Sequence, residues 1–193
     1  MSPPGWRCTP TAPTRRTGSP RLRELPAARV QQCDATHLPY ADAAFDVVIA
    51  NHMLYHVDDP DAALHEFARV LRPGGRLAVA LNGRDHLAEL DALGPAIGHP
   101  DLSVGRHRND VTAETTPARI AAHFTDVTVE RYPDELAVPA VAPVLAYLAS
   151  MVGPLTAAQE SAADDLVRAR IEAEGAFRVR KHSVLISATR GPR

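Results

Sequence analysis

A chain of 193 residues is long enough for one domain with a substantial core and too short for two ordinary domains. Its 45% hydrophobic and 23% charged content is typical of a soluble globular protein. The formal net charge of −2 at pH 7 excludes a general attraction to nucleic acid or to an anionic membrane surface.

Two further function classes are excluded by simple counts. Cys8 and Cys33 are the only cysteines, which is too few for a disulfide framework or a cysteine-based metal site. No apolar run approaches the roughly 18–20 residues that span a bilayer. The N-terminus also lacks the apolar core of a signal peptide. We therefore expect a cytoplasmic protein.

Residues 1–28 differ in composition from the rest of the chain. They are rich in proline and arginine and carry Glu24 as their single acidic residue. Such a segment has little apolar surface to bury, so we expect it to be disordered. A transit peptide, a nucleic-acid-binding arm, and a misplaced start or shifted frame attached to a domain fragment are the open interpretations. The domain itself is expected to run from residue 29 to 193.

The next elements in chain order predict a strand–helix–strand unit. Residues 28–33 favour a short strand ending at Asp34, and residues 45–50 form an apolar run typical of a strand buried on both faces. A helix should begin after Asp59, since Asp is a good N-cap and Pro60 suits the first helical position. A glycine turn at 73–75 ends that helix, and residues 76–81 favour the next strand, as in a right-handed crossover.

The second half of the chain predicts a mixture of helices and strands. Helices are expected over 85–93, from Thr116 to about Phe124, over 139–151 and over 156–174, the last with a capping box formed by Thr156 and Gln159. Strands are expected over 127–132 and 177–189. Residues 94–110 form an irregular segment suited to a lid or substrate loop.

One stretch carries a family signature. It runs from Cys33-Asp34-Ala35-Thr36-His37-Leu38-Pro39-Tyr40, through Phe45-Asp46-Val47-Val48-Ile49-Ala50-Asn51 and Leu54-Tyr55-His56-Val57, to Arg69-Val70-Leu71-Arg72-Pro73-Gly74-Gly75. This order of acidic loop, apolar strand, helix and Pro-Gly-Gly turn resembles a class I S-adenosylmethionine (SAM)-dependent methyltransferase, within its small-molecule group. The resemblance implies an α/β, Rossmann-like sheet with a C-terminal antiparallel strand, SAM as cofactor and a small-molecule methyl acceptor.

The resemblance also implies a cofactor site. Asp34 matches the acidic residue that accepts a hydrogen bond from the adenine amino group, and the backbone N–H of Ala35 matches a contact to a ring nitrogen. Asn51 matches a residue beside the methionine moiety. Taken from the residues alone, Asp34 could instead cap its loop and Asn51 could be a turn residue at a strand end.

Tyr55 and His56 are the expected wall residues of the substrate pocket, and either could orient a nucleophile. His52 and His56 are four residues apart, which is also the spacing of a two-histidine metal pair. No third ligand lies nearby in the sequence, so no metal is expected. Glu66 and Arg69 are expected to be surface or helix-end partners without a catalytic role.

The chain departs from the family at its start. The G-x-G-x-G loop, the strand before it and the acidic strand end that holds the ribose are not found, so the sequence predicts an N-terminally truncated domain. In the family strand order 3-2-1-4-5-7-6, the missing strands one and two lie between strand three (28–33) and strand four (45–50), so their loss leaves strand four with an unpaired apolar edge. We expect strand three to slide in beside strand four. Otherwise the exposed edge pairs with another molecule, or the chain is unstable alone.

Two other functions remain as alternatives. The chain could be a non-catalytic remnant that serves as a binding or dimerisation module, or a nucleotide-dependent oxidoreductase. The latter is disfavoured because no G-x-G-x-x-G follows a strand. The methyl acceptor is expected to be chosen by residues 94–110 and the helices within 139–174.

Overall fold

The computed structural model describes residues 31–102 and 110–192, so the expectations for residues 1–28 and for the start of the 28–33 strand lie outside the described residues. The strands are β1 (Phe45–Asn51), β2 (Leu71–Asn82), β3 (Thr125–Val138) and β4 (Phe177–Thr189). The helices are α1 (Pro60–Val70), α2 (Ala88–Asp91), α3 (Thr116–Ala121), α4 (Val141–Val152) and α5 (Ala157–Glu174), with 3₁₀ turns η2 (Leu54–His56) and η3 (Gly94–Ile97).

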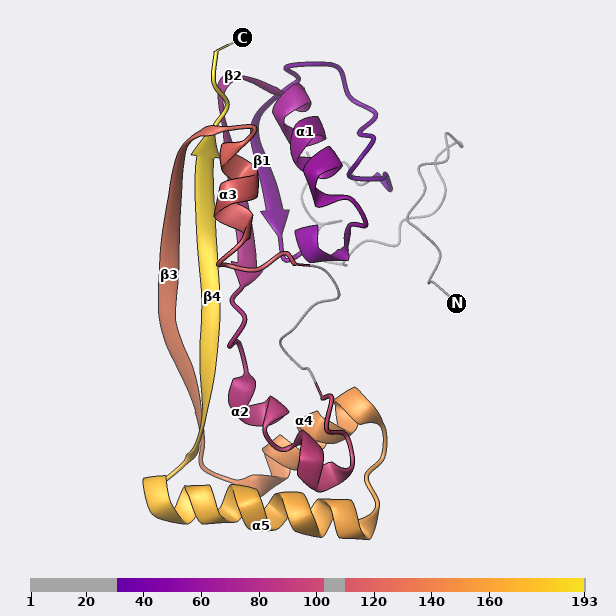
Figure 1. The fold of residues 1–193 in the computed structure, drawn as a ribbon, viewed down its shortest axis with the longest axis vertical. Helices are drawn as coiled ribbons and strands as arrows, with labels where there is room; N and C mark the ends of the chain where they lie inside the picture. Colours follow the sequence, from indigo (N-terminus) through magenta and orange to yellow (C-terminus); the bar gives the residue numbers. More distant parts are fainter. Residues whose placement is uncertain (1–30, 103–109, 193) are drawn as a thin grey trace, which may run out of the picture.

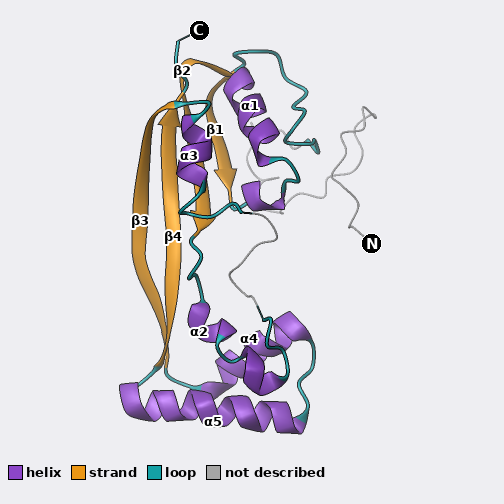
Figure 2. Ribbon diagram, in the orientation of Figure 1, coloured by secondary structure: helices purple, strands orange, loops and turns teal. Residues whose placement is uncertain are grey.

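The four strands form one mixed sheet in the order β1-β2-β4-β3 (Figure 2). β1 and β2 are parallel, joined by the crossover through α1, and β4 runs antiparallel to both β2 and β3. The predicted α/β class and C-terminal antiparallel strand are therefore confirmed. Among the described residues none of these helices has the length and apolar character to cross a membrane.

The upper part of the sheet buries one of its faces. Alternate residues of β2 and β4 point toward α1 and α3 and are almost fully buried. They pack with apolar residues of those helices in one cluster, whose buried members include Leu64, Phe67, Leu77, Val79, Leu81, Ile120, Val184, Ile186 and Ala188. Each such side chain contributes about 1.5–3 kcal/mol relative to leaving it in water. This cluster fixes the register of the parallel pair.

A second apolar cluster lies at the other end of the long β3–β4 pair (Figure 1). There α2, η3, α4 and α5 pack around the start of β4, burying Phe177 and Val179. The capping box of α5 forms as predicted, because the Thr156 side chain accepts from the Gln159 amide and Gln159 returns the bond. Gly175 ends the helix with φ of 80°, a value that glycine adopts without strain.

The packed side of β4 changes along its length. In the lower half the buried residues are odd-numbered, Phe177 and Val179, whereas in the upper half they are even-numbered, Val184, Ile186 and Ala188. Successive residues of a strand point to opposite faces of the sheet. β4 therefore packs against the lower core with one face and against the upper core with the other face. The residues at the changeover, 180–183, are all polar or charged and belong to neither core. We call this region the waist.

Several predicted boundaries are wrong. Residues 31–33 carry no strand, and among described residues β1 pairs only with β2, so no strand three lies beside it there. The helix expected over 85–93 is shorter in the structure, where α2 covers only Ala88–Asp91. α3 begins at Thr116 as predicted but ends at Ala121, before the predicted end near Phe124. β3 extends to Val138 because β4 pairs with it along its whole length.

Candidate functional site

The loop that carries Asp34 is a tight turn. The Asp34 carboxylate accepts hydrogen bonds from the Thr36 amide at 2.9 Å and from the Thr36 hydroxyl at 2.8 Å, and the Asp34 carbonyl accepts from the His37 amide at 3.1 Å. The bonds from the Thr36 amide and hydroxyl lower the pKa of Asp34. The carboxylate is therefore ionised at neutral pH, and it can only accept hydrogen bonds.

Glu66 and Arg69 of α1 fasten this loop to the domain. Glu66 accepts from the Leu38 amide at 2.8 Å and from the Arg69 Nε at 2.7 Å. Arg69 also donates to the carbonyls of Leu38 and Tyr40 and pairs with Asp42 at 2.9 Å. The hydrogen bond from Arg69 dominates, and it holds the pKa of Glu66 at about 2. Glu66 and Arg69 are paired near the end of α1, as predicted, and they also connect α1 to the Asp34 loop, which the prediction did not include.

An apolar cavity of about 320 Å³ runs along the edge of β1 that does not face β2. Ala35 and Leu38 of the loop line one side of it, and Ile49 and Met53 line another. The cavity therefore brings the Asp34–Ala35 turn together with the segment that follows β1. Val47 and Ile49 at this edge are 49% and 72% exposed, which is unusual for β-branched residues in a strand interior.

Asn51, Tyr55 and His56 follow one another at the carboxyl end of β1. Asn51 is the last residue of the strand and is exposed, and its Cα lies opposite that of Ala80 on β2. His52, at φ of 48°, turns the chain and donates its amide to the Ala80 carbonyl at 2.9 Å. The rings of Tyr55 and His56 meet edge to face with centroids 4.6 Å apart. Burial raises the pKa of Tyr55, so its hydroxyl stays protonated at neutral pH.

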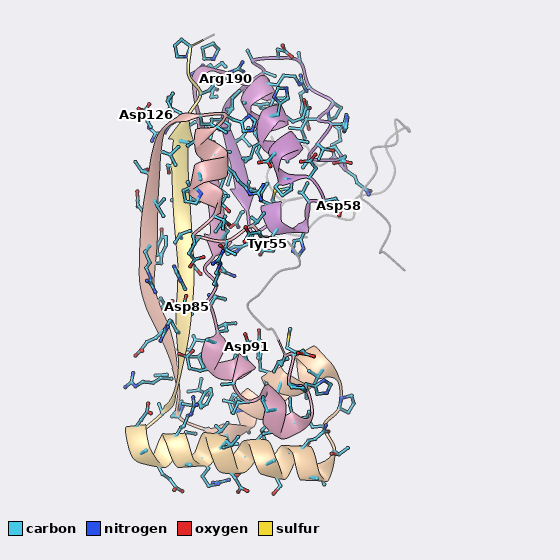
Figure 3. All side chains as sticks on the ribbon, viewed as in Figure 1. Tyr55, Asp58, Asp85, Asp91, Asp126 and Arg190 are labelled. Atoms are coloured by element: carbon cyan, nitrogen blue, oxygen red, sulfur yellow. The ribbon has the colours of Figure 1, made fainter. Side chains whose placement is uncertain are left out.

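A second group of polar residues at the waist was not anticipated from the sequence. Asp85 and His86 follow β2, Glu114 precedes α3, and Arg180 and His182 lie on β4. Asp85 pairs with Arg180 at 2.7 Å and with the Nδ1 of His182, and these two bonds lower the pKa of Asp85 to about 2. In Figure 3, Tyr55 lies at the lower end of the upper half of the molecule, and Asp85 lies below it, above the lower helices.

The waist group also has the composition of a metal site. Asp85, Glu114 and His182 each offer one ligand atom, and these atoms lie within 4.8 Å of one another. Against this, Arg180 already neutralises Asp85, and the Arg84 amide donates to Glu114. A cation would have to displace a bound guanidinium, so we assign no metal here. His52 and His56 do not form a ligand cluster with a third residue among residues 31–102 and 110–192.

Comparison with known proteins identifies part of the chain. Residues 10–79 match the model of a methyltransferase domain family. This segment includes the Asp34 loop, β1, α1 and most of β2.

Residues 10–79 thus resemble a methyltransferase domain.

The methyltransferase-domain match begins at residue 10, within residues 1–28, which were expected to precede the domain. Methyltransferase GfsG of Streptomyces halstedii is 57% identical over 47 residues, which cover 24% of this chain and 17% of that protein. The O-methyltransferase resE of Aspergillus sclerotiorum is 54% identical over 101 residues, covering 50% of this chain and 38% of that protein. The chain thus spans less than half the length of these two relatives.

Solved structures show the same fold. A Bacillus halodurans C-125 protein assigned as a methyltransferase superposes with a TM-score of 0.53 at 16% identity, covering 84% of this chain and 78% of that one. This confirms the predicted Rossmann-like methyltransferase fold for the described chain. The domain resembles the class I, SAM-dependent, small-molecule group, in agreement with the sequence signature.

Proposed function

We propose that this chain is, or is part of, a SAM-dependent methyltransferase that acts on a small-molecule acceptor. The observation that carries the proposal is the methyltransferase-domain match over residues 10–79, which contains Asp34, Ala35 and Asn51. The names of the relatives support it, since resE is an O-methyltransferase and another relative, from Amycolatopsis mediterranei, is a 27-O-demethylrifamycin SV methyltransferase.

The residues of the Asp34 turn fit the adenosyl end of SAM. The ionised Asp34 carboxylate can accept a hydrogen bond from an exocyclic amino group, and the apolar cavity beside Ala35 suits an aromatic ring. Asn51, at the carboxyl end of β1, would hold the methionine end, because ligands of open α/β sheets bind outside the carboxyl ends of the strands. SAM supplies an activated methyl group on a sulfonium, and the protein's contribution is to align the acceptor with it.

Tyr55 and His56 would form a wall of the acceptor pocket. Their edge-to-face contact orients both rings, and the protonated Tyr55 hydroxyl can donate a hydrogen bond to an acceptor oxygen. The choice of acceptor would then depend on the elements across the waist, α2, η3, α4 and α5.

Calorimetric titration of S-adenosylhomocysteine into the whole chain tests the proposal. We expect saturable binding that Asp34→Asn weakens at least tenfold, about 1.4 kcal/mol. Asn keeps an oxygen for Thr36, so the turn survives while the charged acceptor is lost. Asp46→Asn is the matched control, because Asp46 is exposed and its carboxylate pairs with Arg72 at the surface. A folded chain that does not bind would contradict the proposal and favour the non-catalytic alternative.

The exposed edge of β1 supports a second candidate function, self-association. Apolar side chains beside an edge that no described strand pairs with are a template for another strand. Light scattering over a concentration series tests it. A mass that stays monomeric at every concentration would contradict it.

A further inference from the structure

The imidazole of His182 is held in one orientation by three separate contacts. Its Nδ1 meets the carboxylate of Asp85, and Glu114 lies 3.8 Å from the same nitrogen. On a third side the ring lies against the backbone of Gly83, where any Cβ would collide with it. The ring is 13% exposed, so it is largely enclosed but still reaches solvent.

The charge state of Asp85 decides which ring nitrogen carries the proton. Asp85 is ionised at neutral pH because the Arg180 guanidinium and His182 stabilise its charge. An ionised carboxylate cannot donate, so the hydrogen bond between it and His182 must come from an Nδ1–H group. A neutral His182 therefore carries its proton on Nδ1 and a lone pair on Nε2. Among described residues no hydrogen bond to Nε2 is seen.

The position of His182 matches the edge at which the cofactor would bind. Gly83 and Asp85 follow β2 directly, so they lie at the same carboxyl edge of the parallel pair as Asn51. His86 lies beside His182, because its Nδ1 accepts the His182 amide at 3.1 Å. Burial is the main cause that lowers the pKa of His86, and the charge of His52 adds to it.

We propose that His182 is the proton-accepting catalytic residue of this domain, that Asp85 is its positioning residue, and that the acceptor bound at the waist presents a hydroxyl group to Nε2. This inference rests on the proposed methyltransferase function. In the step, the acceptor oxygen forms a bond to the methyl carbon while the carbon–sulfur bond breaks and leaves its electron pair on sulfur. The acceptor's proton passes to Nε2 of His182, and the resulting imidazolium is stabilised by Asp85 and Glu114.

A histidine-labelled chain tests the proposal without requiring methyl transfer. Long-range nitrogen–proton NMR correlations report which ring nitrogen is protonated, and the His182 signals are assigned by their loss in His182→Asn. We expect an Nδ1–H ring with a bare Nε2 in the whole chain. Asp85→Ala should lower the Nδ1–H population. Asp134→Asn is the control, because it removes a carboxylate paired with the adjacent Lys181 and leaves the ring's own partners in place. A ring protonated on Nε2 would overturn the proposal.

The hydroxyl preference is tested on the same sample with phenol and toluene as probes. They have similar shape, and only phenol carries a hydroxyl group. A saturable shift of the His182 Nε2 signal with phenol and not with toluene supports the proposal. A response to neither probe, or an equal response to both, overturns it. Because neither probe needs the cofactor, these results are independent of S-adenosylhomocysteine binding, and the two hypotheses fail separately.

Discussion

The backbone amide of Leu38 donates a 2.8 Å hydrogen bond to the carboxylate of Glu66, in the middle of α1. The same carboxylate accepts a hydrogen bond from the Arg69 Nε. The other two guanidinium nitrogens of Arg69 donate to two backbone carbonyls of the loop. The loop that carries Asp34 is thus fixed by two half-buried residues of a helix and not by its own short turn alone. The geometry of the candidate cofactor site therefore depends on residues that would never touch the cofactor.

Substituting Glu66 should loosen the Asp34 loop. Glu66→Gln removes the charge that Arg69 and the Leu38 amide share, and hydrogen bonds to charged groups are worth about 1.5–3 kcal/mol. We expect the free energy of unfolding to fall by about 2 kcal/mol and S-adenosylhomocysteine binding to weaken with it. Urea unfolding measures the first effect. Glu172→Gln, at an exposed site on α5, is the control and should change neither quantity.

The stabilising effect of Glu66 should depend on pH. Its pKa is about 2 in the folded chain and ordinarily 4.5, so its contribution is fully present above pH 4.5 and is lost as the pH falls toward 2. The difference in unfolding free energy between the wild type and Glu66→Gln should therefore shrink over that window. Urea midpoints at several pH values between 7 and 3 check this. A difference that stays constant would show that the charge of Glu66 is not involved.

Gly83 should tolerate no side chain. In Gly83→Ala the new methyl group occupies the place of the His182 ring, so we expect a loss of about 1–3 kcal/mol of stability and a displaced ring. Thermal unfolding and the His182 NMR signals report the two effects. Gly191→Ala is the control, because its Cβ would meet only the Thr125 methyl carbon, at 3.5 Å. Unchanged His182 signals in Gly83→Ala would contradict the placement of the ring.

The capping box of α5 also connects this helix to η3. Gln159 bonds with Thr156 at the helix start and donates to the Ile97 carbonyl at 2.5 Å. Thr156→Ala should cost about 1 kcal/mol, and Gln159→Ala should cost more because it also leaves the Ile97 carbonyl unpaired. Denaturant unfolding of both single variants and the double variant gives their coupling. Ser161→Ala, exposed on the same helix, should be close to neutral.

Adding a charge at the exposed edge of β1 should reduce self-association of the chain. Ile49→Lys places a charge at the most exposed large apolar residue of that strand, which opposes pairing with another strand. We expect the self-associated fraction measured by light scattering to fall. Leu166→Lys, at an exposed apolar site on α5, adds the same charge away from the sheet and should leave association unchanged. Equal effects of the two variants would point to a general change in solubility.

Elements with local signals could be predicted closely. The bounds of β4 agree with its prediction residue for residue, and α1 and α5 begin where their caps indicate, because a cap and an apolar period act over a few neighbouring residues. The reach of β3 and the shortness of α2 could not be predicted. β3 continues as far as β4 offers it a partner, and α2 occupies only the space that the lower core leaves.

The candidate site residues also divide into those that have a local sequence signal and those that have none. The Asp34, Asn51, Tyr55 and His56 positions come from a continuous stretch of sequence, and their cofactor and pocket roles remain predictions. Asp85, Glu114 and His182 come from three distant segments that meet only when β4 enters the sheet. The hydrogen bonds between Glu66 and the loop are equally non-local. No periodicity or spacing along the chain signals either group.

The position of β4 has a consequence for biosynthesis. β4 lies between β2 and β3 in the sheet, yet it follows both of them in the sequence. Among the described strands, a chain emerging from the ribosome therefore has β2 paired on one side only, and β3 without a neighbour, until β4 has been made. Arg190 then closes the structure by donating to the Arg69 carbonyl at the end of α1. Non-local pairing of this kind is slow and leaves apolar strands exposed to aggregation. The nascent chain should consequently depend on chaperones until β4 has been made, and removing a few residues of β4 should be far more damaging than their number suggests.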